Sequence, residues 1–202
     1  AWLGTDFAEA RHHAEVAQAA FRRTDDGEGI AWSLINLGSA ALYNGDLLRA
    51  ETLLQEAHTL SSRMGYREGV GWTLSQLGVV ARRNGDLDVA VRHLDESLAL
   101  QHHLGDRWRS ASVLEELARL ALMRDDVPYA AFLLGTAEAV RTSIGTPIPA
   151  CEVADHEFTV TGVQAALGDR AELAWAAGRA TPLGDVVEAR NLPPETEMLD
   201  LQ

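Results

Sequence analysis

The sequence predicts an all-α fold, a solenoid of antiparallel helix pairs that repeats every 40 residues. The first observation is a recurrent apolar position, occupied by Leu34, Leu74 and Leu114. The second is a turn sequence, Asn-Gly-Asp, which stands at 44–46 and again at 84–86. The third is that the residues between these turns are apolar or small with the period of a helix face. A fixed period of this length is typical of a solenoid.

Each repeat divides into two helices. Residues 30–43 and 47–62 each place apolar or small side chains on one helical face, and a polar loop from Thr24 to Gly29 precedes the first of them. Between the two helices, Gly45 is suited to the left-handed conformation at a helix end. Asp46 is suited to accept hydrogen bonds from the free N–H groups of the next helix.

The third copy and a partial first copy vary this turn. In the third copy we expect Asp126 to cap the second helix, with Pro128 in the first turn, where its missing N–H costs little. Near the start of the chain, Asp6 and Glu9 have the spacing of a capping box. The chain begins partway through this copy, so we expect it to be part of a longer polypeptide.

Glycine recurs inside the first helix of the repeat, at Gly38 and Gly78. Glycine in a helix costs roughly 1 kcal/mol relative to alanine, so its recurrence requires a reason in packing. Small residues also recur on the second helix, at Ala50 and Ala90. We therefore expect the two helices of a pair to approach closely at these positions.

The 40-residue periodicity ends at the prolines within residues 146–149, which favour extended backbone. We predict capping helices over about 152–167, 171–179 and 183–189, with Phe158, Leu167, Leu173 and Trp175 covering the last repeat. The predicted organisation is a solenoid over 1–149 (half repeat 1–29, repeats 30–69, 70–109 and 110–149), capping helices over 150–190 and a tail or linker over 191–202.

Composition limits the classes of function. The formal net charge is −13, which disfavours direct binding to nucleic acid, and hydrophobic residues make up 47% of the chain, enough for a core. The single cysteine, Cys151, can form no internal disulfide, and no secretory signal or membrane span is visible, so we expect a cytoplasmic protein. All 17 basic residues are arginine, which favours a bacterial source.

No catalytic motif is present. The sequence lacks a phosphate-binding loop, a nucleophile elbow and the spacing of a zinc site, so we expect no catalytic residue, no cofactor and no metal. His156, with Asp155 and Glu157 beside it, is expected on a solvated face.

The spacing L-x2-L-G-x2-A-x8-A-x3-L-x2-A from Leu34 resembles the tetratricopeptide (TPR) repeat. The period of 40 exceeds the usual length of about 34 and would also suit HEAT repeats, but the glycine and alanine positions favour the TPR form. The resemblance implies a right-handed superhelix whose first helices line a groove. The candidate groove residues are Trp32, Ile35, Asn36, Ser39, Tyr43, Trp72, Gln76, Val79, Arg82, Arg83, Glu115 and Arg119.

Two interpretations of the tryptophans stay open. Trp32 and Trp72 are either binding anchors in the groove or part of a structural spine between adjacent first helices, since they occupy equivalent repeat positions. Replacing both by alanine distinguishes the two, because loss of binding indicates anchors and loss of stability alone indicates a spine.

Residues 6–190, and most specifically 132–149 and 165–183, resemble the C-terminal TPR region of bacterial LuxR-type and SARP-type ATPase transcriptional regulators, whose sensor region is similar to that of the maltose-operon activator. The resemblance implies a sensor or interaction arm that binds a protein, peptide or small inducer and acts on an ATPase switch and a helix-turn-helix elsewhere in the same polypeptide. The alternatives are a stand-alone adaptor for a protein or peptide, and a receptor for a small signalling peptide or sugar.

This interpretation predicts that the 202-residue chain hydrolyses no nucleotide and binds no DNA by itself. Phosphate release from ATP by the purified chain would contradict it, and the control is the same preparation after heat denaturation.

Overall fold

The computed structural model describes residues 7–191, and every regular element in that range is helical. A short 3₁₀ turn, Gly168–Arg170, joins α8 to α9. The helices are α1 (Phe7–Thr24), α2 (Gly27–Tyr43), α3 (Leu47–Met64), α4 (Arg67–Asn84), α5 (Leu87–Leu104), α6 (Arg107–Met123), α7 (Val127–Ile144), α8 (Val153–Leu167), α9 (Ala171–Ala180) and α10 (Leu183–Asn191).

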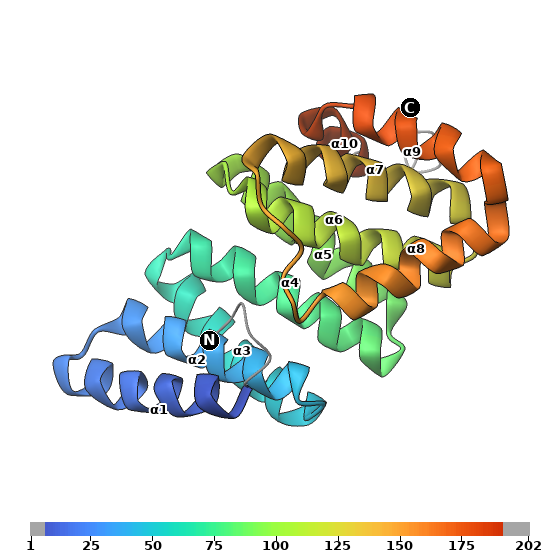
Figure 1. The fold of residues 1–202 in the computed structure, drawn as a ribbon. Coiled ribbons are helices and arrows are strands. Elements are labelled where there is room, and N and C mark those ends of the chain that lie inside the picture. The colour runs from blue at the N-terminus through green and yellow to red at the C-terminus, as the bar shows by residue number, and fades with distance from the viewer. Residues whose placement is uncertain (1–6, 192–202) are drawn as a thin grey trace, which may run out of the picture.

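Consecutive helices pack against one another from α1 to α7 (Figure 1). In addition, α2 contacts α4 and α4 contacts α6, so these three helices form one face, which we call the first-helix face. The predicted all-α fold of helix pairs is confirmed. Among the described residues, no helix is long and apolar enough to cross a membrane.

The turns have the predicted chemistry. Gly45 has a φ of 85° and Gly85 a φ of 89°, both left-handed. The Asp46 carboxylate accepts from the Arg49 N–H at 3.2 Å, and Asp126 accepts from the Tyr129 N–H at 3.3 Å. The predicted capping box involves Asp6, which lies outside the described residues.

Helix α2 begins earlier than predicted. The sequence predicts a polar loop over Thr24–Gly29, but Asp26 caps a helix that starts at Gly27, accepting from the Gly29 N–H at 3.0 Å. A Cβ on Gly29 would lie 2.3 Å from the Phe21 ring, so a side chain here would require that ring to move.

Close approach explains the glycines inside helices. A Cβ on Gly38 would lie 2.7 Å from Leu54 Cγ and 3.5 Å from the Ala50 carbonyl oxygen. The equivalent Cβ on Gly78 would lie 2.6 Å from Leu94 Cγ. The predicted contact of the paired helices is therefore confirmed.

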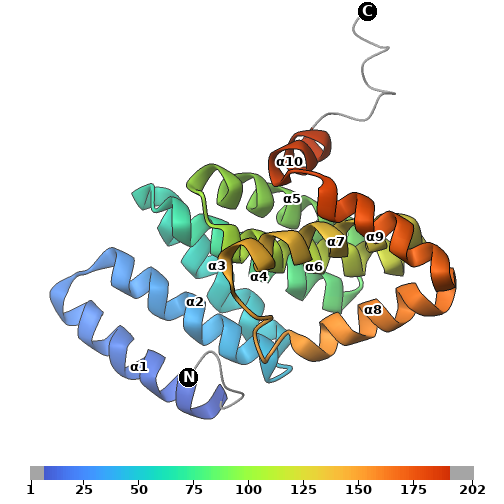
Figure 2. The same cartoon turned by 45° about the horizontal axis from the view of Figure 1, so that its top comes forward.

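The C-terminal helices close the far end of the molecule (Figure 2). Helix α9 packs on α7 and α10 packs on α5, where Arg190 donates to Asp95 at 2.6 Å. Of the four residues predicted to cover the last repeat, Leu167 and Trp175 do pack against its core, but the prediction is wrong for Phe158 and Leu173, which are 61% and 80% exposed. Backbone contact takes their place, because Gly135 and Gly178 let α7 and α9 approach without side chains between them.

The segment after α7 determines the shape of the first-helix face. Residues 145–152 run back from the end of α7 past α6 towards α4, and only then does α8 begin (Figure 1). Pro149 is buried and Cys151 is half-buried in this position.

We predict that Gly178→Ala detaches α9 from α7, because the added Cβ would overlap the Phe132 carbonyl group, which is backbone and cannot rotate away. Overpacking of this kind costs about 1–3 kcal/mol or more, and chemical denaturation followed by circular dichroism measures it. The control is Gly184→Ala, whose Cβ would lie 3.6 Å from the nearest atom outside its own turn. Equal stability of the two variants would contradict the close approach.

Candidate functional site

A pocket of about 270 Å³ lies on the first-helix face. Trp32, Trp72 and Trp108 each contribute to it, one from each of α2, α4 and α6, and we call it the tryptophan pocket. The remaining lining residues are Tyr43, Ser75, Gln76, Val79, Leu94, Arg109, Ser112, Val113, Glu116, Pro149, Cys151 and Glu152.

Aromatic rings form one wall of the pocket. The Trp32 and Trp72 ring centres are 4.5 Å apart with the planes at 61°, an edge-to-face arrangement. The Arg109 guanidinium lies over the Trp72 ring, 4.3 Å from its centre, and is paired with Asp106. Trp32 is 39% exposed, so it stands at the mouth. The two tryptophans contact each other and also face the cavity.

Two carboxylates line the pocket as well. Glu116 accepts from Arg82 Nε at 2.8 Å, and Glu152 accepts from the Ser112 hydroxyl at 2.9 Å. Burial, followed by the charge of Glu115, raises the pKa of Glu152 to about 7. Burial also raises the pKa of Glu116, against the opposing effect of Arg82.

The segment that contributes Pro149, Cys151 and Glu152 to the pocket is held in place by ion pairs of Asp155. The Asp155 carboxylate accepts from Arg82 at 2.8 Å and lies 3.4 Å from Arg119 and 3.8 Å from Arg83. The expectation of a solvated face is therefore wrong for Asp155. It is also wrong for His156, which is 22% exposed and lies 3.6 Å from Glu115. Each was judged from its polar neighbours in sequence, and the partners come from other helices.

The predicted groove residues divide into groups. Five of them line the tryptophan pocket, namely Trp32, Tyr43, Trp72, Gln76 and Val79.

Two positions on α2 were predicted wrongly. Ile35 and Ser39 are fully buried, Ile35 in a core cluster with Leu34 and Ala57. They therefore present no surface to a ligand, because α2 is covered on more sides than a groove-lining helix would be. Asn36 is 8% exposed, and its amide donates to the Trp32 carbonyl at 2.7 Å.

The predicted charged residues are engaged within the protein. Arg82 and Arg119 hold Asp155, while Arg83 donates to the Leu42 carbonyl at 2.9 Å. Glu115 does not line the tryptophan pocket, and it receives two hydrogen bonds from Arg141, at 2.6 and 2.8 Å.

Several pocket residues were missed. Ser112 is the position equivalent to Trp72 in the next repeat. Trp108 and Arg109 lie about one helical turn before Ser112 and therefore on the same helix face, a signal that could have identified Trp108. Cys151 and Glu152 lie outside the repeat, and no periodicity leads to them.

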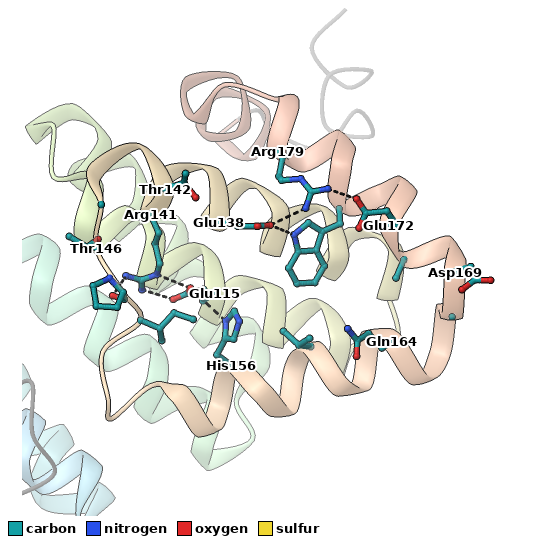
Figure 3. A pocket seen from close by; sticks show the side chains of 17 residues that line it. Glu115, Glu138, Arg141, Thr142, Thr146, His156, Gln164, Asp169, Glu172 and Arg179 are labelled. Atoms are coloured by element: carbon teal, nitrogen blue, oxygen red, sulfur yellow. Dashed lines mark hydrogen bonds and ion pairs between the residues drawn. The ribbon is translucent and has the colours of Figure 1, made fainter.

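A second, larger cleft of about 850 Å³ lies between α7, α8 and α9 (Figure 3). Its polar side chains are largely paired. Trp175 and Arg179 both donate to Glu138, Arg179 also pairs with Glu172, and the Glu115–Arg141 pair lies at one end (Figure 3).

Comparison with protein-family models, curated proteins and solved structures finds no match for this chain. Burial raises the pKa of the Cys151 thiol, which disfavours the reactive thiolate. Within residues 7–191, no group of three or more His, Cys, Asp or Glu side chains could hold a metal ion. What the tryptophan pocket offers is aromatic surface, carboxylates and an amide, which suit binding.

We predict that Glu115→Gln destabilises the chain by about 3 kcal/mol, because it leaves the buried Arg141 guanidinium without its charge partner. The matched control is Glu138→Gln, since Glu138 is 48% exposed and its loss changes stability by less than about 1 kcal/mol. Urea denaturation of the variants measures both, and similar losses would contradict the assigned burial.

Proposed function

We propose that the chain is a non-catalytic binding scaffold of TPR-like helix pairs with a 40-residue period and a right-handed superhelix. In this proposal it forms the sensor or interaction arm of a larger bacterial transcriptional regulator. The starts of α2, α4 and α6 at Gly27, Arg67 and Arg107 support the period. The close approach at Gly38 and Gly78 supports the TPR form.

The observation that carries the proposal is the tryptophan pocket. It brings together three half-buried or exposed tryptophans from three separate helix pairs. Aromatic side chains in a concave site are the usual anchors of binding surfaces. The neighbouring arginines serve a structural purpose, since they hold the polypeptide that closes the pocket.

The pocket favours a small ligand over a long peptide. Its volume of about 270 Å³ is close to the lower limit of ordinary small-molecule sites, about 300 Å³. Residues 149–155 also cover part of the first-helix face, where an extended peptide would otherwise lie. A small inducer therefore suits this site better than a protein segment does.

In the regulator, the ligand would act by population shift. A small molecule that binds the arm more tightly in one state of an ATPase switch than in another moves the equilibrium between those states. The alternatives remain a stand-alone adaptor and a receptor for a small peptide or sugar. The coding sequence on either side decides between arm and adaptor, because a phosphate-binding loop upstream supports the regulator and its absence supports the adaptor.

We expect a small-molecule library, screened by thermal shift, to give hits whose binding requires Trp32. Trp32→Ala should weaken these hits by about 2 kcal/mol, the loss typical of an aromatic anchor. Because Trp32 is 39% exposed, the variant should remain folded.

The control variant is Trp175→Ala, which alters the cleft between α7, α8 and α9 and leaves the tryptophan pocket intact. Hits that survive Trp32→Ala but are lost with Trp175→Ala would move the ligand site to the other cleft and contradict the proposal.

A further inference from the structure

We infer that the tryptophan pocket binds a small organic ammonium ion, a protonated amine joined to a flat aromatic body. The inference rests on the proposed function, in which this pocket is the ligand site, and adds the chemical class of the ligand. It depends on three features of the lining residues, namely their aromatic surface, an unpaired acceptor and one poorly compensated carboxylate.

The aromatic wall already binds one cation, the Arg109 guanidinium, over the face of an indole ring. The guanidinium carbon of Arg109 is 4.3 Å from the centre of the Trp72 ring and 5.9 Å from that of Trp108. Indole faces attract cations through the negative potential of their π electrons. Trp32, which packs at 61° to Trp72 and is 39% exposed, leaves further indole surface for the apolar body of a ligand.

Gln76 supplies an acceptor that is not used. Its side chain lines the pocket, the residue is only 9% exposed, and Oε1 has no hydrogen-bond partner among the described residues. A buried acceptor left without a donor costs about 1–3 kcal/mol. Oε1 itself is closed to solvent, so a ligand N–H would recover that free energy once the Gln76 amide turns towards the cavity. An ammonium group with N–H bonds is such a donor, whereas a carboxylate is not.

The charges that line the pocket also favour a cationic ligand. Three charged residues line it, and Arg82 neutralises Glu116 while Asp106 neutralises Arg109. Glu152 is the third.

Glu152 has weaker compensation than the other two. It accepts from the neutral Ser112 hydroxyl, and its nearest cation, Arg141, is 3.7 Å away and already bound by both oxygens of Glu115. An incoming cation would therefore find its counter-ion at Glu152.

The test is isothermal titration calorimetry of the full chain at about pH 8 with three probes of matched shape: 2-phenylethylammonium, neutral 2-phenylethanol and anionic 3-phenylpropionate. We expect the ammonium to bind at least about tenfold more tightly than either of the others, which corresponds to about 1.4 kcal/mol. A fourth probe, trimethyl-2-phenylethylammonium, has the charge but no N–H and should bind more weakly than the parent because Gln76 gains no donor.

Glu152→Gln removes the charge and keeps the acceptor for Ser112. It should abolish most of the preference for the ammonium, and the affinity for neutral 2-phenylethanol should change by much less than that for the ammonium. Glu138→Gln, in the other cleft, is the matched control and should leave both affinities unchanged. Melting curves of the two variants establish that each is folded.

The affinity should also depend on pH. Because the pKa of Glu152 is raised to about 7 by burial and by Glu115, its carboxylate is largely protonated below that pH and ionised above it. Affinity for the ammonium should therefore rise from about pH 6 to about pH 8 in the native chain and stay flat in Glu152→Gln. The titratable or charged groups that interact with Glu152 are Glu115 and Glu116 from α6, Arg141 from α7, Tyr43 from α2 and the adjacent Cys151.

Equal or tighter binding of the alcohol or the carboxylate would overturn the ligand class while leaving the pocket as a binding site. Absence of binding by all probes would overturn the class too. The proposed function would then depend on the library screen with Trp32→Ala, which is independent of these probes. Binding of the ammonium that is unchanged in Glu152→Gln would remove Glu152 from the site.

Discussion

The C-terminal part of the chain is held against the first helices by the buried Arg82 guanidinium. It bonds at 2.8 Å to Glu116 on α6 and at 2.8 Å to Asp155 on α8. Arg82 thus joins three helices that are distant in sequence, and its side chain is only 5% exposed. A guanidinium removed from water to this degree requires both partners, so the position of α8 is coupled to the face formed by α2, α4 and α6.

The tryptophan pocket follows from that coupling. The helix pairs bring Trp32, Trp72 and Trp108 to one face, and the segment fixed through Asp155 places Cys151 and Glu152 opposite them. Repetition alone would give an open aromatic surface. The polypeptide that folds back makes it a partly covered site with a carboxylate, which suits a small ligand.

The fold was largely predictable from local rules. Apolar periodicity located the helices, and the glycine of each turn located their ends to within a few residues, since Gly45 and Gly85 are left-handed as the turn chemistry requires. The start of α2 was missed because glycine at 27 and 29 disfavours helix by propensity. Capping by Asp26 and the fit of Gly29 against Phe21 prevail over that propensity.

The site was predictable only in part. Trp32 and Trp72 could be identified because the resemblance to a TPR repeat places the first helices along a groove, yet the same resemblance wrongly placed Ile35 and Ser39 there. Which face of a helix stays open depends on what the rest of the chain covers. Glu152 could not be found from the repeat, because its place depends on a segment outside the 40-residue pattern and on arginines from two other helices.

The most direct test of this account is the rate at which iodoacetamide modifies Cys151, the single cysteine of the chain. In the native protein we expect much slower modification than in denaturant, since Cys151 is half-buried against the pocket and burial raises its pKa. Asp155→Asn should accelerate the reaction by releasing the segment, whereas Asp95→Asn, which loosens α10 instead, should not. Modification of the native chain as fast as in denaturant, or an unchanged rate in Asp155→Asn, would contradict the account.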